Sequence, residues 1–173
     1  EGGTSEELWA FTSTGNLYNT TAQGAVGAPA VSALSNGWWE HSNITTAGGS
    51  YMYAVNGLDS PLLYNGSTWT AITGISSPAI TGVTTNTLSN VLLFKHRLWF
   101  IQKGTLKAWY LPTDAIGGVA QPFDLSAVAS LGGYLVDFEA WTVDGGYGVD
   151  DNLAFFTSEG EMIIYRGTDP ASS

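Results

Sequence analysis

The 173-residue sequence contains no cysteine and has little positive charge, with 5 Lys and Arg against 15 Asp and Glu. The absence of cysteine excludes a disulfide framework, a thiolate metal site and a cysteine nucleophile. The formal net charge of −10 excludes the broad basic surface with which proteins bind nucleic acid. No apolar run reaches the roughly 18–20 residues that a membrane helix needs. We therefore expect no sequence-specific nucleic-acid binding and no membrane insertion.

Glycine and aromatic residues are abundant instead, with 22 Gly, 7 Trp, 8 Tyr and 7 Phe. A disordered acidic chain is poor in aromatic residues, whereas a protein of many short strands and tight turns needs both types. Helical periodicity is broken every few residues by Gly, Pro, Thr or Asn. Only Asp124–Leu131 is compatible with a helical turn, capped by Asp124, and a loop is the equal alternative. The sequence predicts an all-β protein.

A loose internal repeat organises the predicted strands. Each copy has an apolar strand, a polar turn closed by Gly and a second apolar strand ending in Tyr. The four copies are Leu8–Tyr18, Tyr51–Tyr64, Leu98–Tyr110 and Leu153–Tyr165. The turn glycines are separated by 42, 47 and 56 residues, at Gly15, Gly57, Gly104 and Gly160. An interval of about 40–50 residues is typical of one four-stranded blade of a β-propeller.

The segments between these hairpins complete the repeating unit. Gly37–Glu40 and Ser67–Ile72 are predicted as outer strands, and Val91–Leu98 as an inner strand that turns directly into the next hairpin. The Gly-, Ser- and Thr-rich stretches are predicted as loops, at 20–37, 73–90 and 112–133. We expect residues 1–173 to form a single all-β, propeller-like domain of repeated antiparallel hairpins, with the ring closed or incomplete. A β-sandwich is the alternative fold.

The two ends of the sequence support a further expectation. The chain begins at Glu1 rather than Met, and it stops at Pro170–Ser173 without a closing structural element. We therefore expect either a processed product or a segment of a longer protein.

Residues that carry chemistry are few and scattered. The two histidines are far apart in the sequence, and His96 falls between Lys95 and Arg97 in a predicted tight turn. No P-loop, nucleophile elbow or zinc-protease motif is present. We therefore expect no catalytic residue, no bound organic cofactor and no enzymatic activity.

Acidic residues concentrate towards the C-terminal end, where seven of the 15 fall between Asp137 and Glu161. Loop 144–152 is the candidate cation site, because Ca²⁺ prefers the oxygens of Asp, Asn and backbone carbonyls in a flexible loop. Its expected ligands are Asp144, Asp150, Asp151 and Asn152. The alternative is a solvated turn with Asx-type caps. Carboxylates in this segment also leave a glycoside hydrolase as an alternative function.

Two groups of residues are candidates for docking. Adjacent Trp38 and Trp39 should face opposite sides of a strand, so one of them is expected at an interface or on a carbohydrate. Four of the five positive charges lie close together, at Lys95, Arg97, Lys103 and Lys107. Because these cations and the acidic segment carry opposite charge, we expect head-to-tail docking between subunits or neighbouring proteins. The alternative is that the cations keep a solvated sheet edge polar and so protect it against aggregation.

Two stretches resemble propeller-like structural proteins of tailed bacteriophages. The first stretch is Val91–Pro112, which contains Val-Leu-Leu-Phe-Lys-His-Arg-Leu-Trp-Phe-Ile and Ala-Trp-Tyr-Leu-Pro. The second stretch is Asp150–Pro170, which contains Leu-Ala-Phe-Phe-Thr-Ser-Glu-Gly-Glu-Met-Ile-Ile-Tyr-Arg-Gly. The resemblance implies a non-enzymatic virion protein of the tail, the tail hub or the head–tail connection. Such a protein acts by assembling with other virion proteins in an oligomer. A module of a phage tail that binds carbohydrate or the host surface is the alternative function.

Overall fold

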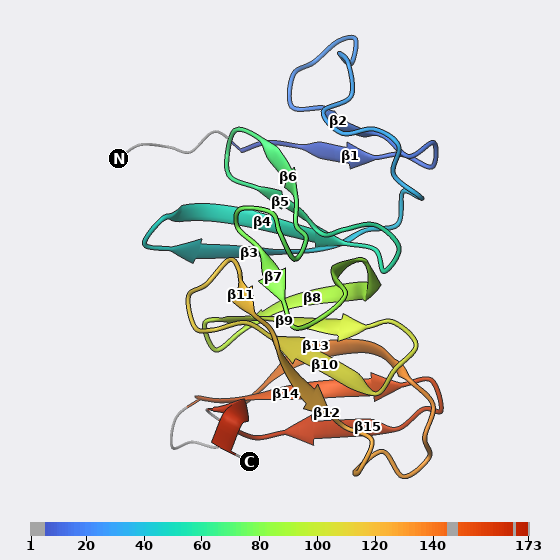
Figure 1. Ribbon diagram of the computed structural model, residues 1–173, viewed down its shortest axis with the longest axis vertical. Coiled ribbons are helices and arrows are strands. Elements are labelled where there is room, and N and C mark those ends of the chain that lie inside the picture. The colour runs from blue at the N-terminus through green and yellow to red at the C-terminus, as the bar shows by residue number, and fades with distance from the viewer. Residues whose placement is uncertain (1–5, 145–148, 168, 173) are drawn as a thin grey trace. The chain divides into compact units, whose positions relative to one another are not determined.

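The computed structural model describes residues 6–144, 149–167 and 169–172. Within these ranges the protein is all-β, with 15 strands, two short 3₁₀ turns and no α-helix. The described residues therefore include no helix that could cross a membrane. The chain divides into two compact units, residues 1–39 and residues 40–173. Figure 1 labels the strands of both units.

The first unit contains one antiparallel hairpin, formed by β1 (Trp9–Phe11) and β2 (Leu17–Asn19). Leu17 is fully buried and also forms a single antiparallel bridge with Val31. This hairpin is the first copy of the repeat, which the sequence predicted correctly.

The outer strand predicted at Gly37–Glu40 is wrong for its first three residues, which are not in a strand. Asn36 causes the difference, because its side-chain oxygen accepts the Trp38 N–H at 2.9 Å and its carbonyl oxygen accepts the Trp39 indole N–H at 3.0 Å. This local turn satisfies donors that a strand would present to a neighbour. The next strand begins only at Glu40.

The second unit contains three antiparallel sheets, and neighbouring strands within each sheet follow the order of the chain. Sheet I consists of β3 (Glu40–Thr46), β4 (Gly49–Val55), β5 (Leu62–Tyr64) and β6 (Trp69–Ala71). Sheet II consists of β8 (Leu88–Phe94), β9 (Arg97–Gln102), β10 (Lys107–Tyr110) and β12 (Gln121–Asp124). Sheet III has three strands, β13 (Leu135–Asp144), β14 (Val149–Thr157) and β15 (Met162–Tyr165).

Short elements connect the sheets. β7 (Ile80–Thr81) and β11 (Gly118–Val119) form a parallel pair, which the sequence did not predict. The turn η1 (Thr85–Thr87) leads into β8, and η2 (Pro170–Ser172) follows β15. The described strands form separate small sheets, and these strands do not close into a ring.

The internal repeat corresponds to the second and third strands of each sheet. β4 pairs with β5, β9 with β10 and β14 with β15, and all three pairs are antiparallel. The predicted inner strand before the third hairpin is confirmed as β8, and the outer strand within Ser67–Ile72 as β6. Lys95 and His96 form the tight turn between β8 and β9, with φ angles of 46° and 61°.

Segment 124–131 contains no helix but does form the predicted single turn, since the Leu125 carbonyl oxygen accepts the Val128 and Ala129 N–H groups at 3.0 and 2.9 Å. Asp124 still acts as a cap, since its carboxylate accepts the Ser126 N–H at 2.9 Å. The hydrogen bonds from Ser126 and the nearby Lys107 ammonium hold the pKa of Asp124 below its usual value.

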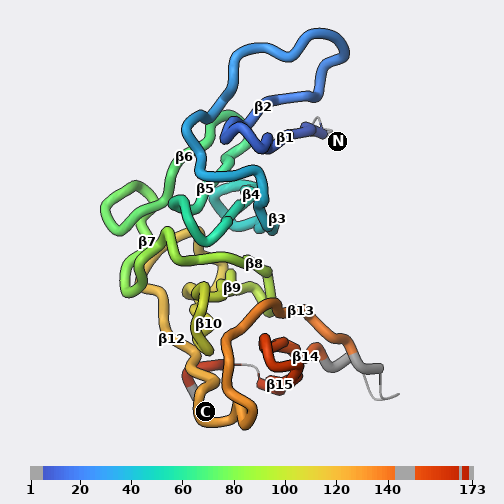
Figure 2. The backbone as a smooth tube through the Cα atoms, turned by 90° about the vertical axis from the view of Figure 1, so that its right-hand side faces the viewer, coloured from blue at the N-terminus to red at the C-terminus, as the bar shows by residue number. Residues whose placement is uncertain are grey.

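Sheets I, II and III follow one another as layers in the views of Figures 1 and 2. Sheets I and II share one core, in which Tyr53 meets Phe100 edge to face with ring centroids 5.8 Å apart. The Tyr53 hydroxyl donates to the carbonyl oxygen of Ile116, and burial raises the pKa of Tyr53. Sheets II and III share a second core that is rich in aromatic side chains.

Strand β9 is buried on both faces. Leu98 and Phe100 belong to the core shared with sheet I, whereas Trp99 and Ile101 belong to the core shared with sheet III. Alternate residues of a strand project to opposite faces, so this run of four apolar residues serves two cores. A continuous apolar run in this fold therefore indicates a sheet with a layer on each side.

Candidate docking surfaces

Strand β14 repeats the apolar pattern of β9. Leu153 and Phe155 lie in the core shared with sheet II, so the intervening Ala154 and the following Phe156 project to the opposite side of sheet III. Neither core of the described residues includes these two side chains. Sheet III therefore has apolar side chains on a face that the two cores leave out.

Strand pairing extends this face across all three strands of sheet III. Trp141 lies opposite Asn152, Ile164 lies opposite Ala154, and Met162 lies opposite Phe156. The outer face of sheet III is defined by five apolar residues: Trp141, Ala154, Phe156, Met162 and Ile164. Trp141 of β13 is 48% exposed and Met162 of β15 is 51% exposed, so both large apolar side chains are accessible to a partner.

The edge of sheet III at β15 also differs from the edges of the other sheets. In sheets I and II the third strand pairs with a fourth, whereas β15 is the last strand of its sheet among the described residues. The chain after β15 is held against sheet II, where Lys95 Nζ donates to the Gly167 carbonyl oxygen at 3.0 Å and Arg97 lies 3.6 Å from the Asp169 carboxylate. These contacts hold Gly167 and Asp169 beside β9 and the turn before it.

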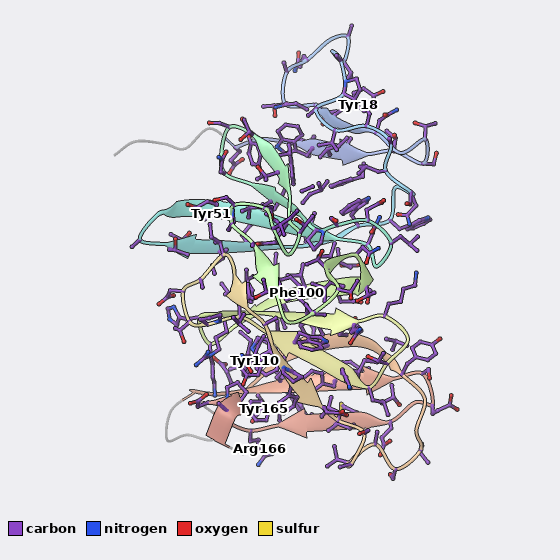
Figure 3. The ribbon with its side chains drawn as sticks, in the orientation of Figure 1. Tyr18, Tyr51, Phe100, Tyr110, Tyr165 and Arg166 are labelled. Carbon is purple, nitrogen blue, oxygen red and sulfur yellow. The ribbon has the colours of Figure 1, made fainter. Side chains whose placement is uncertain are left out.

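Carboxylates accompany the apolar residues of sheet III. Asp137 lies opposite Phe156 and Glu139 lies opposite Ala154, so both side chains project from the outer face of sheet III. Asp137 also accepts a hydrogen bond from the Asn90 side chain at 3.2 Å. Among the described residues of the segment that forms sheet III, the one cation is Arg166, directly after β15 (Figure 3).

Glu161 has a structural role beside β15. Its carboxylate accepts the Ser130 hydroxyl at 2.6 Å and the backbone N–H groups of Ser130 and Leu131 at 3.1 Å. These hydrogen bonds hold the pKa of Glu161 below its usual value. Glu161 therefore anchors the loop that leads into β13.

The four residues predicted as a cation site are not in one loop. Asp144 ends β13 and Asp150 lies in β14, and their side chains are outside the described part of the chain. Asp151 and Asn152 are successive residues of β14, so their side chains project to opposite faces. Asp151 accepts the Thr142 hydroxyl at 2.7 Å, and the buried Asn152 amide donates to the Trp141 carbonyl at 3.4 Å. The described side chains of this set do not converge.

Trp38 and Trp39 differ in exposure, as the sequence led us to expect, although neither residue lies in a strand. Trp38 is 86% exposed. Trp39 is half-buried and stacks on Phe11 with ring centroids 4.9 Å apart. Trp38 is therefore the aromatic residue of this pair that is accessible to a ligand, and its use by a ligand stays a prediction.

The basic residues predicted for docking differ in their surroundings. Lys95 binds Gly167 and Arg97 lies beside Asp169, and the Arg97 guanidinium also lies 5.6 Å from the centre of the Tyr110 ring. Lys107 lies 3.7 Å from the Asp124 carboxylate on the surface, an arrangement that contributes little to stability. Lys103 is exposed. Head-to-tail docking through these residues stays a prediction, with Lys103 and Lys107 the exposed members of the set.

The outer face of sheet III was missed as a site by sequence reasoning. The available signal was the run Leu153–Phe156, which is apolar at every position. Such a run is typical of a strand covered on both faces, whereas a strand with one solvated face alternates. A glycine-closed turn followed the run, so the segment was interpreted as one more hairpin.

Comparison with known proteins returned no match. No protein-family model, no curated protein and no solved structure is similar to this chain. Among the described residues, no three His, Asp or Glu side chains lie close enough together to hold a metal ion. The function is therefore argued from the sequence and from the surfaces described above.

Proposed function

We propose that this chain is a non-enzymatic structural protein of a tailed-bacteriophage particle, located in the tail, the tail hub or the head–tail connection, and that it acts by assembling with other virion proteins. The observation that carries the proposal is the apolar outer face of sheet III, at the end of a stack of sheets that is otherwise joined by apolar cores. An exposed apolar surface on a folded protein marks a site of interaction. The resemblance at Val91–Pro112 and Asp150–Pro170 supports a virion as the setting.

The three sheets support a propeller-like arrangement. Their first strands are joined to one another, since the Leu93 N–H of β8 donates to the Ser42 hydroxyl of β3 at 3.1 Å, and Asn90 of β8 binds Asp137 of β13. First strands side by side and stacked antiparallel sheets are features of consecutive propeller blades. We propose that sheets I to III are three such blades and that other polypeptide segments supply the rest of the ring.

Purified phage particles from the source culture test this function. Particles separated on a density gradient would be digested and analysed by quantitative mass spectrometry for peptides of this chain. We expect the peptides to sediment with the particle, in a fixed ratio to the other tail proteins. Recovery of the chain only in the soluble fraction would contradict the proposal.

Trp38 favours a second candidate function, which is binding of carbohydrate on a host surface. An exposed indole ring provides a flat apolar surface for stacking on a sugar, with an N–H group for a polar contact. The exposure of Trp38 fits this role better than the stacked position of Trp39.

A glycan array with three proteins tests this candidate. Trp38→Ala should lose binding, whereas Trp39→Ala is the matched control for loss of an indole ring in the same segment. Binding by none of the proteins, or equal binding by Trp38→Ala and the unmodified chain, would exclude a carbohydrate site at Trp38.

A further inference from the structure

The outer face of sheet III has the composition of a face that is covered by another sheet. β9 and β14 both have four consecutive apolar residues, and in β9 each face of that run is covered by a neighbouring sheet. In β14 only the face with Leu153 and Phe155 is covered in this way. Stacked sheets lie about 10 Å apart with interdigitating side chains, and the outer face offers the large side chains that such packing needs.

The charges beside this face indicate the chemistry of the covering sheet. Asp137 and Glu139 lie on this face, and Glu159 and Glu161 lie between β14 and β15. The same segment has one described cation, Arg166 (Figure 3). Complementary charges favour association and like charges oppose it, so a partner that carries cations around an apolar centre fits this surface.

A second copy of the chain does not meet that requirement. Its own outer face would bring Asp137 and Glu139 to the contact once more, and the chain has a net charge of −10. In a head-to-tail contact, Lys95 and Arg97 are already engaged by Gly167 and Asp169, and Lys107 lies beside Asp124. Of these clustered cations only Lys103 has no such contact among the described residues, so a different protein supplies a basic rim better than a second copy does.

We propose that the outer face of sheet III is the docking site for a β-sheet of a different protein, whose contacting face is apolar at its centre and carries Lys or Arg at its rim. This inference rests on the proposed function in that it names the chemistry of an assembly partner. Trp141 on β13 and Met162 on β15 are the exposed apolar residues of this face, and Asp137 and Glu139 attract the basic rim.

A synthetic β-hairpin serves as the probe for this surface. Its contacting face carries Val and Tyr with Lys at the rim, and a second hairpin replaces every Lys with Glu. Binding of each fluorescein-labelled hairpin to the full chain is measured by fluorescence anisotropy at moderate ionic strength. We expect the Lys hairpin to bind and the Glu hairpin to bind at least about tenfold more weakly, as charge complementarity requires.

Variants locate the binding on sheet III. Met162→Lys should weaken binding of the Lys hairpin about tenfold, because it places a charge in the centre of the interface. Ile75→Lys is the matched control, since Ile75 is an exposed residue of the loop between β6 and β7. Glu139→Lys should shift the preference towards the Glu hairpin, with Glu40→Lys as its control on sheet I.

Three results would overturn the proposal. They are no binding of the Lys hairpin, equal binding by the Met162→Lys and Ile75→Lys variants, and a dimer of the unmodified chain that Met162→Lys dissociates in sedimentation velocity. The last result would identify a second copy as the occupant. Because these measurements use the isolated chain, their failure is distinct from absence of the chain from phage particles.

Discussion

Trp99 lies at the centre of the core between sheets II and III. Its ring centroid is 5.0 Å from that of Tyr110, 5.5 Å from Phe123 and 6.3 Å from Phe155. The side chain is 1% exposed, and its indole N–H has no hydrogen-bond partner among the described residues. Trp99 therefore contributes to stability through packing rather than through a polar contact.

Replacement of Trp99 should show this directly. We expect Trp99→Ala to lower the free energy of unfolding by about 3–5 kcal/mol, because it leaves a cavity among aromatic rings. Trp99→Phe should cost less, since it retains an aromatic ring and removes an unpaired N–H. Urea unfolding followed by circular dichroism measures both changes.

The control is Trp38→Ala, which removes an indole that is almost fully exposed. Its effect on the free energy of unfolding should stay within about 0.5 kcal/mol. A similar loss of stability for Trp38→Ala and Trp99→Ala would contradict the assignment of Trp99 to the core.

The turn glycines of the repeat provide a second test for single residues. Gly57 and Gly104 both have a positive φ, of 68° and 70°. A Cβ atom on Gly57 would lie 2.9 Å from the Cβ of Ser89, whereas a Cβ atom on Gly104 would meet no atom within 4 Å. The two positions thus share the backbone requirement and differ in the space around them.

We expect Gly104→Ala to lower the free energy of unfolding by about 1–2 kcal/mol, the cost of a left-handed conformation for a residue with a Cβ atom. Gly57→Ala should cost more, because Ser89 must also move. Thermal and urea unfolding of the two variants measure the difference. A larger loss for Gly104→Ala than for Gly57→Ala would show that the turn at Gly57 is packed differently.

At the scale of elements, the loop before β13 depends on one carboxylate. Glu161 accepts hydrogen bonds from Ser130 and Leu131, and these hold its pKa below the usual value. A carboxyl group whose pKa is lowered on folding stabilises the folded state above its unfolded pKa of about 4.3. That stabilisation is lost as the pH falls through the lower folded value.

Glu161→Gln should therefore reduce stability at neutral pH and have little effect in acid. The difference in urea midpoint between the variant and the unmodified chain should be present at about pH 7 and shrink as the pH falls below the unfolded pKa of about 4.3. Glu40→Gln, at an exposed glutamate of β3, is the control. A pH-independent difference for Glu161→Gln would contradict an ionised anchor.

The repeat allowed the hairpins to be predicted from the sequence, because apolar strands and glycine-closed turns are local signals. The strands that complete the sheets were harder to predict. β12 lies within a segment expected to be a loop and contains Pro122. It is the edge strand of sheet II, where the missing proline N–H can point away from the ladder. Its position depends on the sheet that it joins rather than on its own residues.

The loop expected over residues 144–152 was predicted too long for a similar reason. The Asp, Gly and Asn residues of 144–152 favour a loop by composition, yet β14 begins at Val149. Pairing with the long strand β13 extends the hairpin through Asp150, Asp151 and Asn152. Long-range pairing therefore overrides local preference here, and the sequence alone could not show where the strand starts.

At the scale of the molecule, both aromatic-rich cores consist entirely of residues from the second unit. The described members of the two cores run from Ile44 to Tyr165. We therefore expect residues 40–173, expressed alone, to unfold cooperatively in urea and to keep the near-ultraviolet circular dichroism of ordered aromatic side chains. A non-cooperative transition for this fragment would show that its cores need residues 1–39.

The central claim for this chain is that it assembles with other proteins through the apolar outer face of sheet III. Hydroxyl-radical footprinting tests it most directly, because Trp141 and Met162 are the exposed side chains of the outer face of sheet III. Oxidation of each residue is measured by mass spectrometry in the isolated chain and in purified phage particles, with buried Trp99 as the internal reference. We predict that Trp141 and Met162 are oxidised in the isolated chain and protected in the particle. Equal oxidation of Trp141 and Met162 in both samples would contradict the claim.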